Sequence, residues 1–137
     1  MDNRQNKTDK PFKLLIIDDD KKVLDTLYGF LTDLKYDVVT ASDGLEGLKL
    51  LEAEQQEFDL VVTDLVMPKI SGNYLISMIK KEFPDMPVIA ITGWDAYPEA
   101  FVIEAEADRL LEKPFEFSEL DKTIKELLSS QNHKIKN

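Results

Sequence analysis

The 137-residue sequence contains no cysteine, and this absence excludes disulfide bonds and metal sites built from thiolates. No apolar stretch reaches transmembrane length, and the first dozen residues lack the apolar core of a signal peptide. Basic residues are few, 17 against 27 acidic ones, and the net charge of −10 argues against direct nucleic-acid binding. We therefore expect a cytoplasmic protein that contacts neither membranes nor nucleic acids directly, and whose acidity serves solubility.

What is present is the composition of an ordinary globular protein, with 43% hydrophobic and 32% charged residues. Its length fits one domain, and neither an internal repeat nor a second domain is visible in the sequence. Residues 1–11 are polar and are expected to be a flexible lead-in, and residues 130–137 a flexible tail. The predicted domain is therefore 12–129.

Strand-like and helix-like patterns alternate five times along this domain. Short apolar runs, typical of strands buried on both faces, cover Lys13–Ile17, Tyr36–Ala41, Leu60–Thr63, Val88–Ile91 and Leu110–Leu111. Helical spacing of apolar residues covers Asp20–Leu34, Leu45–Leu51, Gly72–Phe83, Asp95 to about Ala107, and Ser118–Leu128. Strands separated by helices run parallel, with helices on both faces of the sheet. The sequence thus predicts a doubly wound α/β sandwich whose ligand site lies beyond the carboxyl ends of its strands.

Polar residues stand at the ends of four of these strands. Asp18 and Asp19 follow the first strand, Asp64 the third, Thr92 the fourth and Lys113 the fifth. In a parallel sheet these side chains share one edge. Two unit charges about 5 Å apart repel by roughly 3 kcal/mol at an effective dielectric constant of 20, so clustered carboxylates need a cation. Few oxygen ligands with room for water favour Mg²⁺.

A hydroxyl and an ammonium group opposite the carboxylates would complete the set that phosphoryl transfer requires. Aspartate can accept the phosphoryl group as an acyl phosphate. Each residue taken singly also fits a structural role. Asp64 could begin a turn, the run Asp18-Asp19-Asp20 could cap a helix, Thr92 could be a strand former, and Lys113 a surface lysine.

Four segments, in this order, resemble the motifs of the receiver domain of two-component response regulators, over roughly Phe12 to Ser129. They are LLIIDDD, LVVTDLVMP followed by SG, AITG and LLEKPF. The resemblance implies a flavodoxin-like, three-layer sandwich with a five-stranded parallel sheet of order 2-1-3-4-5. It also implies that the domain is a phosphorylation-controlled switch, whose phosphoryl group comes from the phosphohistidine of a sensor histidine kinase or phosphotransfer protein.

The resemblance also assigns roles to the residues at the strand ends. Asp64 is the implied phosphoacceptor, Thr92 turns toward the phosphoryl group, and Lys113 pairs with its oxygens. A cis peptide bond is implied between Lys113 and Pro114, and would aim the ammonium group inward. The implied Mg²⁺ ligands are Asp18, Asp19, Asp64 and the backbone carbonyl of Val66.

Phosphorylation is expected to shift the face formed by the fourth helix, fifth strand and fifth helix between two packings. This face carries Trp94, Phe101 and Leu110, and is our candidate surface for an unknown output protein, although the same residues could belong to the core. A homodimer is also compatible with the sequence. The only histidine, His133, lies in the polar tail, so the phosphodonor histidine must belong to another protein.

The sequence departs from the family pattern at a few positions. Leu110 stands where the family often has an aromatic ring, and Glu106 where it often has glycine. Val66 and Trp94, each two residues beyond a site residue, are apolar where many relatives have polar groups. No side chain at these positions orients attacking water, and the Trp94 indole is expected to shield the acyl phosphate. The acyl phosphate is therefore expected to be long-lived.

Three other functions compete with this interpretation. A receiver-like docking module that is never phosphorylated is the main alternative. A haloacid-dehalogenase-like phosphatase needs a second aspartate two residues after Asp64, where this chain has Val66. A flavodoxin-like electron carrier needs a loop rich in Gly, Ser and Thr where this chain has its acidic pair. We therefore expect no enzymatic activity other than the domain's own phosphorylation and dephosphorylation.

Overall fold

The computed structural model describes residues 10–53, 57–65, 67, 70–93 and 107–136. These residues form five strands and four helices. In chain order they are β1 (Lys13–Ile17), α2 (Lys21–Asp33), β2 (Asp37–Ala41), α3 (Gly44–Glu52), β3 (Leu60–Asp64), α4 (Gly72–Glu82), β4 (Val88–Thr92), β5 (Arg109–Glu112) and α6 (Phe117–Lys136).

All five strands pair in parallel in one sheet, in the order β2-β1-β3-β4-β5. The predicted doubly wound sandwich and its strand order are confirmed. The register places Ile17 opposite Thr63, and Asp64 opposite Ile91. The residues that follow β1, β3 and β4 therefore come together at one edge of the sheet.

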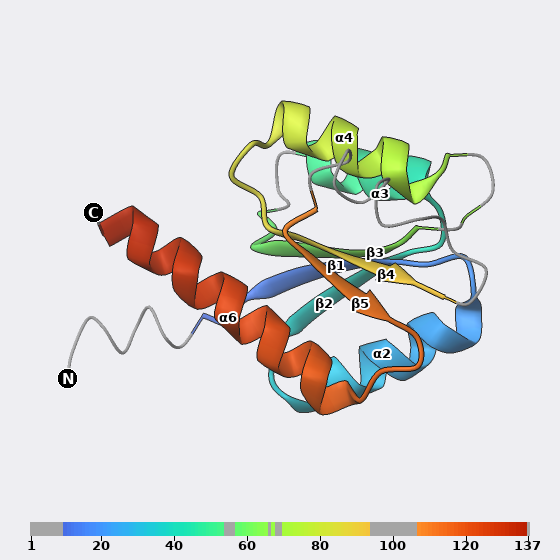
Figure 1. Ribbon diagram of the computed structural model, residues 1–137, viewed down its shortest axis with the longest axis horizontal. Coiled ribbons are helices and arrows are strands. Elements are labelled where there is room, and N and C mark those ends of the chain that lie inside the picture. The colour runs from blue at the N-terminus through green and yellow to red at the C-terminus, as the bar shows by residue number, and fades with distance from the viewer. Residues whose placement is uncertain (1–9, 54–56, 66, 68–69, 94–106, 137) are drawn as a thin grey trace.

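The helices form two layers, with α2 and α6 on one face of the sheet and α3 and α4 on the other (Figure 1). Successive residues of β1 serve opposite faces, because side chains alternate along a strand. Leu14 and Ile16 belong to the core beneath α2 and α6, whereas Leu15 and Ile17 belong to the core beneath α3 and α4. This burial on both faces explains why the central strands are continuous apolar runs.

Three helices have an N-cap residue whose side chain accepts hydrogen bonds from backbone N–H groups of the first turn. Asp20 accepts hydrogen bonds from the backbone N–H groups of Lys22 and Val23, which confirms it as the N-cap of α2. Asp43 caps α3 in the same way, and Ser71 caps α4. These caps satisfy backbone donors that have no partner within the helix.

Two of the predicted helices need comment, because one lies largely outside the described residues and the other is longer than predicted. One helix is expected from Asp95 to about Ala107, and residues 95–106 of it lie outside the described residues. The last helix continues to Lys136, beyond its predicted end at Leu128. The apolar stripe stops there, but no proline or glycine follows Leu128 to end the helix.

Candidate functional site at the carboxyl edge of the sheet

Three aspartates meet where β1 and β3 end. Asp18 and Asp64 are buried, with exposed fractions of 1% and 7%, and Asp19 is exposed. One carboxylate oxygen from each lies within 4.8 Å of the other two. The convergence follows from the topology, because β1 and β3 are neighbouring parallel strands.

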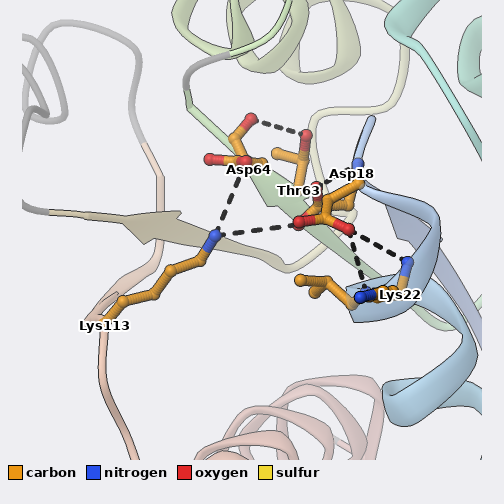
Figure 2. A network of polar contacts seen from close by, with 7 residues as sticks. Asp18, Lys22, Thr63, Asp64 and Lys113 are labelled. Atoms are coloured by element: carbon orange, nitrogen blue, oxygen red, sulfur yellow. Dashed lines mark hydrogen bonds and ion pairs between the residues drawn. The ribbon is translucent and has the colours of Figure 1, made fainter.

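Lys113 brings an ammonium group to the same place from the end of β5. Its Nζ lies 3.8 Å from Oδ2 of Asp64 and 4.0 Å from Oδ2 of Asp18 (Figure 2). Its backbone N–H donates to the carbonyl of Thr92 at 2.7 Å, which ties the residue after β5 to the end of β4. The peptide bond between Lys113 and Pro114 is cis, as expected.

Burial dominates the electrostatics of Asp18 and raises the pKa of its carboxyl group to about 6. The backbone N–H of Asp20, which donates to Asp18 Oδ1 at 2.9 Å, lowers this pKa. The nearby carboxylates of Asp64 and Asp19 raise it, and Lys113 lowers it. The raised pKa shows that the single ammonium group and the hydrogen bond do not fully compensate the buried negative charge.

Two oxygen atoms at this edge have unused hydrogen-bonding capacity. In the described part of the chain, three buried side-chain atoms lack a hydrogen-bond partner, and two of them are Asp18 Oδ2 and Thr92 Oγ1. Such atoms are rare in folded proteins, and the binding of an ion or ligand would give them a partner. Three converging carboxylate oxygens match the hard oxygen ligands that Mg²⁺ prefers, and Oδ2 of Asp18 has no hydrogen bond in the described part of the chain.

The backbone around Asp64 involves two residues to which the sequence pattern assigned no role at the site. The buried hydroxyl of Thr63 donates to the Asp64 carbonyl at 3.1 Å. Gly72, the first residue of α4, packs so closely that a Cβ atom there would lie against that carbonyl oxygen. A glycine at the start of a helix beside a strand end was the available signal for this close approach.

The family model described as the response regulator receiver domain matches residues 14–125. The chain belongs to the response regulator receiver family. It is therefore a receiver domain of the kind found in two-component response regulators, a signalling module, and its cluster of aspartates is consistent with the phosphorylation site of this family.

Relatives of this receiver domain include longer regulatory proteins. The transcriptional regulatory protein PhoP for alkaline phosphatase synthesis in Bacillus subtilis is 32% identical over 117 residues, a match that covers 85% of this chain and 48% of PhoP. The transcriptional regulatory protein GlrR of Escherichia coli K12 is 44% identical over 91 residues, covering 66% of this chain and 20% of GlrR. The chain thus spans about half the length, or less, of these curated relatives.

Solved structures share the fold closely. A CheY-like receiver domain protein from Methanospirillum hungatei JF-1 is 32% identical and has a TM-score of 0.84, with 90% of this chain and 98% of that chain covered. The response regulator TrrA from Thermotoga maritima, solved in complex with Mg²⁺ and BeF, is also 32% identical, with a TM-score of 0.76 and 85% and 98% coverage.

Several predicted features of this receiver domain lie outside the described residues. They are the Mg²⁺ ligand Val66, the shielding residue Trp94, the surface residue Phe101, and Glu106. Leu110 is described, and it is partly buried and packs against the core beneath α3 and α4. None of the helices that the structure describes is long and apolar enough to cross a lipid bilayer.

Proposed function

We propose that this receiver domain accepts a phosphoryl group on Asp64 from the phosphohistidine of a sensor histidine kinase or phosphotransfer protein. The observation that carries the proposal is the convergence of Asp18, Asp19 and Asp64 within 4.8 Å, with the Lys113 ammonium group 3.8 Å from Asp64. A buried carboxylate beside a cation at the end of a rigid strand suits nucleophilic attack on phosphorus.

Each polar group has a role in this transfer. An Asp64 carboxylate oxygen forms a bond to phosphorus while the donor's nitrogen–phosphorus bond breaks, and the imidazole nitrogen keeps that electron pair. Lys113 offsets negative charge on the phosphoryl oxygens. The Thr92 hydroxyl, which has no hydrogen-bond partner among the described residues, would donate to one of those oxygens.

Asp18, Asp19 and Asp64 are the residues that would hold Mg²⁺, together with the expected carbonyl of Val66. When bound, the ion would neutralise the acidic cluster and stabilise charge on the transferring group. Asp18 contributes a buried carboxylate, one oxygen of which lacks a hydrogen bond among the described residues, and one carboxylate oxygen of Asp64 lies within 4.8 Å of one of Asp18.

Signal output is proposed to occur by contact with another protein in the cytoplasm. The face formed by segment 95–107, β5 and α6 would change its packing when Thr92 moves toward the phosphoryl group. An output protein or a second copy of the chain would read this change. The domain 12–129 would catalyse only its own phosphorylation and dephosphorylation.

Intact-mass spectrometry after incubation with acetyl phosphate and Mg²⁺ tests the proposal. The wild-type chain should gain one phosphoryl group, and Asp64→Asn should gain none. Asp59→Asn is the matched control, because Asp59 directly precedes the first residue of β3, whereas Asp64 is its last. We expect the Asp59→Asn variant to be phosphorylated normally. EDTA should prevent the gain.

Two results would contradict the proposal. A wild-type chain that gains no mass would favour the docking module that is never phosphorylated. A gain that persists in Asp64→Asn would place the modification on another residue.

A further inference from the structure

We propose that Thr63 is a positioning residue for the phosphoacceptor, because its hydroxyl helps to hold the Asp64–Leu65 peptide that aims the Asp64 carboxylate. This inference rests on the proposed function and assigns a role to a residue that does not itself touch the phosphoryl group.

The hydroxyl of Thr63 is the first contact on this peptide. Thr63 is completely buried, and its Oγ1 donates to the carbonyl oxygen of Asp64 at 3.1 Å (Figure 2). Val61 and Val62 occupy the preceding positions of β3, so a valine at position 63 would serve the strand as well. The hydroxyl is what distinguishes threonine here, and its hydrogen bond is made to the phosphoacceptor residue itself.

The opposite edge of the same peptide is held by β4. The N–H of Leu65 donates to the carbonyl of Ile91 at 3.0 Å. In a trans peptide the carbonyl and the N–H point in opposite directions, so these two hydrogen bonds restrain the peptide plane from both sides.

Gly72 restrains the peptide through close packing. A Cβ atom at position 72 would lie against the Asp64 carbonyl oxygen and 2.5 Å from the Leu65 Cα. The backbone N–H of Gly72 also donates to the Leu65 carbonyl at 3.0 Å. The first turn of α4 therefore packs directly on the backbone that follows Asp64.

The other charged groups of the site are positioned by different contacts. Asp18 is held by the backbone N–H of Asp20, and Lys113 by its own N–H bond to Thr92. Loss of the Thr63 hydroxyl would therefore shift Asp64 relative to groups that stay in place. A shift of about 1 Å in a reacting group can slow a reaction by roughly 100-fold, so even a small rotation of this peptide should slow phosphorylation.

The test compares Thr63→Val, which has nearly the same shape without the hydroxyl, with Thr63→Ser, which keeps it. Initial rates of phosphorylation by acetyl phosphate at saturating Mg²⁺ are followed by intact mass. We expect Thr63→Val to be slower by about 10-fold, and Thr63→Ser to stay close to the wild-type rate. The urea unfolding midpoint of Thr63→Val should fall only slightly, because the loss of one neutral hydrogen bond has a modest net effect on stability, and the variant should therefore be folded in the rate assay.

Thr63→Val at the wild-type rate, or Thr63→Ser as slow as Thr63→Val, would overturn the assignment. If Thr63→Val does not fold, Thr63→Cys replaces it, because cysteine has a similar size and only a weak donor. Thr63→Cys at the wild-type rate, or Thr63→Ser as slow as Thr63→Cys, would then overturn the assignment. The wild-type chain is measured in parallel. A wild-type chain that is never phosphorylated would refute the proposed function, whereas a fast Thr63→Val would refute only the role of Thr63.

Discussion

Asp18 keeps a carboxyl group almost entirely out of water, and burial is the main reason that its pKa is raised to about 6. In an unfolded chain the pKa of aspartate is about 3.9. Between these two values the native protein binds more protons than the unfolded chain. Protonation of Asp18 therefore stabilises the metal-free fold, and its ionisation destabilises it.

The first prediction concerns the pH dependence of stability in EDTA. The free energy of unfolding should fall as pH rises from about 4 to about 6, with a contribution from Asp18 of up to about 3 kcal/mol, and this contribution should be constant above that range. Asp18→Asn should lose this part of the slope and be more stable than the wild type at pH 7. Urea unfolding at several pH values measures both. Equal slopes for the two proteins would show that Asp18 does not carry the effect.

A second prediction compares two helical glycines, one packed closely against backbone and one with open space around it. A Cβ at Gly72 would meet the backbone of Asp64 and Leu65, so Gly72→Ala should lower the free energy of unfolding by about 1–3 kcal/mol and slow phosphorylation. A Cβ at Gly29, within α2, would meet nothing within 4 Å. Gly29→Ala should therefore raise stability by about 0.5–1 kcal/mol, because alanine is the better helix former. Equal effects of the two substitutions would contradict the close packing at Gly72.

The strands could be predicted because three of them, β1, β3 and β4, are buried on both faces and so are continuous apolar runs. Alternation with helices then required parallel pairing. The strand order could not be predicted from the residue pattern, because it depends on which crossovers pack on which face of the sheet. It was predicted from the family resemblance. The end of α6 was missed because its apolar stripe stops at Leu128, whereas the helix continues to Lys136.

The same reasoning explains what could be predicted of the site. Asp18, Asp19 and Asp64 follow two apolar runs, and neighbouring parallel strands bring such residues together. The contact made by Thr63 could not be predicted in this way. Threonine is an ordinary strand former, and the partner of its hydroxyl depends on how the next peptide is oriented. Raised pKa values, as at Asp18, likewise depend on burial that no residue pattern specifies.

A third prediction concerns the link between the start of the second strand and the last helix. Tyr36, just before β2, donates from its hydroxyl to Oδ1 of Asp121 in α6 at 2.8 Å, and it packs against the core beneath α2 and α6. Burial, reinforced by Asp121, raises the pKa of Tyr36, so the tyrosine remains a donor. Tyr36→Phe should lower the free energy of unfolding by about 2 kcal/mol, because a hydrogen bond to a charged group is lost.

Tyr28→Phe is the matched control for this link. Tyr28 lies on α2 and is about half exposed, at 48%. Its substitution should change the free energy of unfolding by less than about 0.5 kcal/mol. Urea unfolding of both variants at pH 7 measures the difference. A Tyr36→Phe variant as stable as Tyr28→Phe would show that the hydrogen bond to Asp121 contributes nothing.

In the molecule as a whole, one sheet carries two separate cores, and the acidic site lies at an edge next to both. Asp64 and Leu65 are adjacent in the chain, yet the carboxylate of Asp64 belongs to the site whereas Leu65 belongs to the core beneath α3 and α4. A change of charge at Asp64 can therefore reach the core beneath α3 and α4 through the adjacent Leu65. Since interfaces and packed cores have discrete arrangements, such a local change can bias a whole face.

The last prediction concerns the time for which the whole molecule stays phosphorylated. Hydrolysis of the acyl phosphate on Asp64 requires a water molecule placed in line with the phosphorus–oxygen bond. The sequence has Val66 two residues after Asp64 and Trp94 two residues after Thr92, and neither side chain can orient such a water as a polar group would. We therefore expect the phosphorylated chain, once separated from its donor, to decay with a half-life far longer than a few seconds.

Val66→Asn should shorten this half-life because its amide can hold the attacking water, whereas Tyr28→Phe should leave it unchanged. Intact mass followed over time after desalting measures the decay. A wild-type half-life of a few seconds, or a Val66→Asn variant that decays no faster, would show that these apolar side chains do not set the duration of the signal.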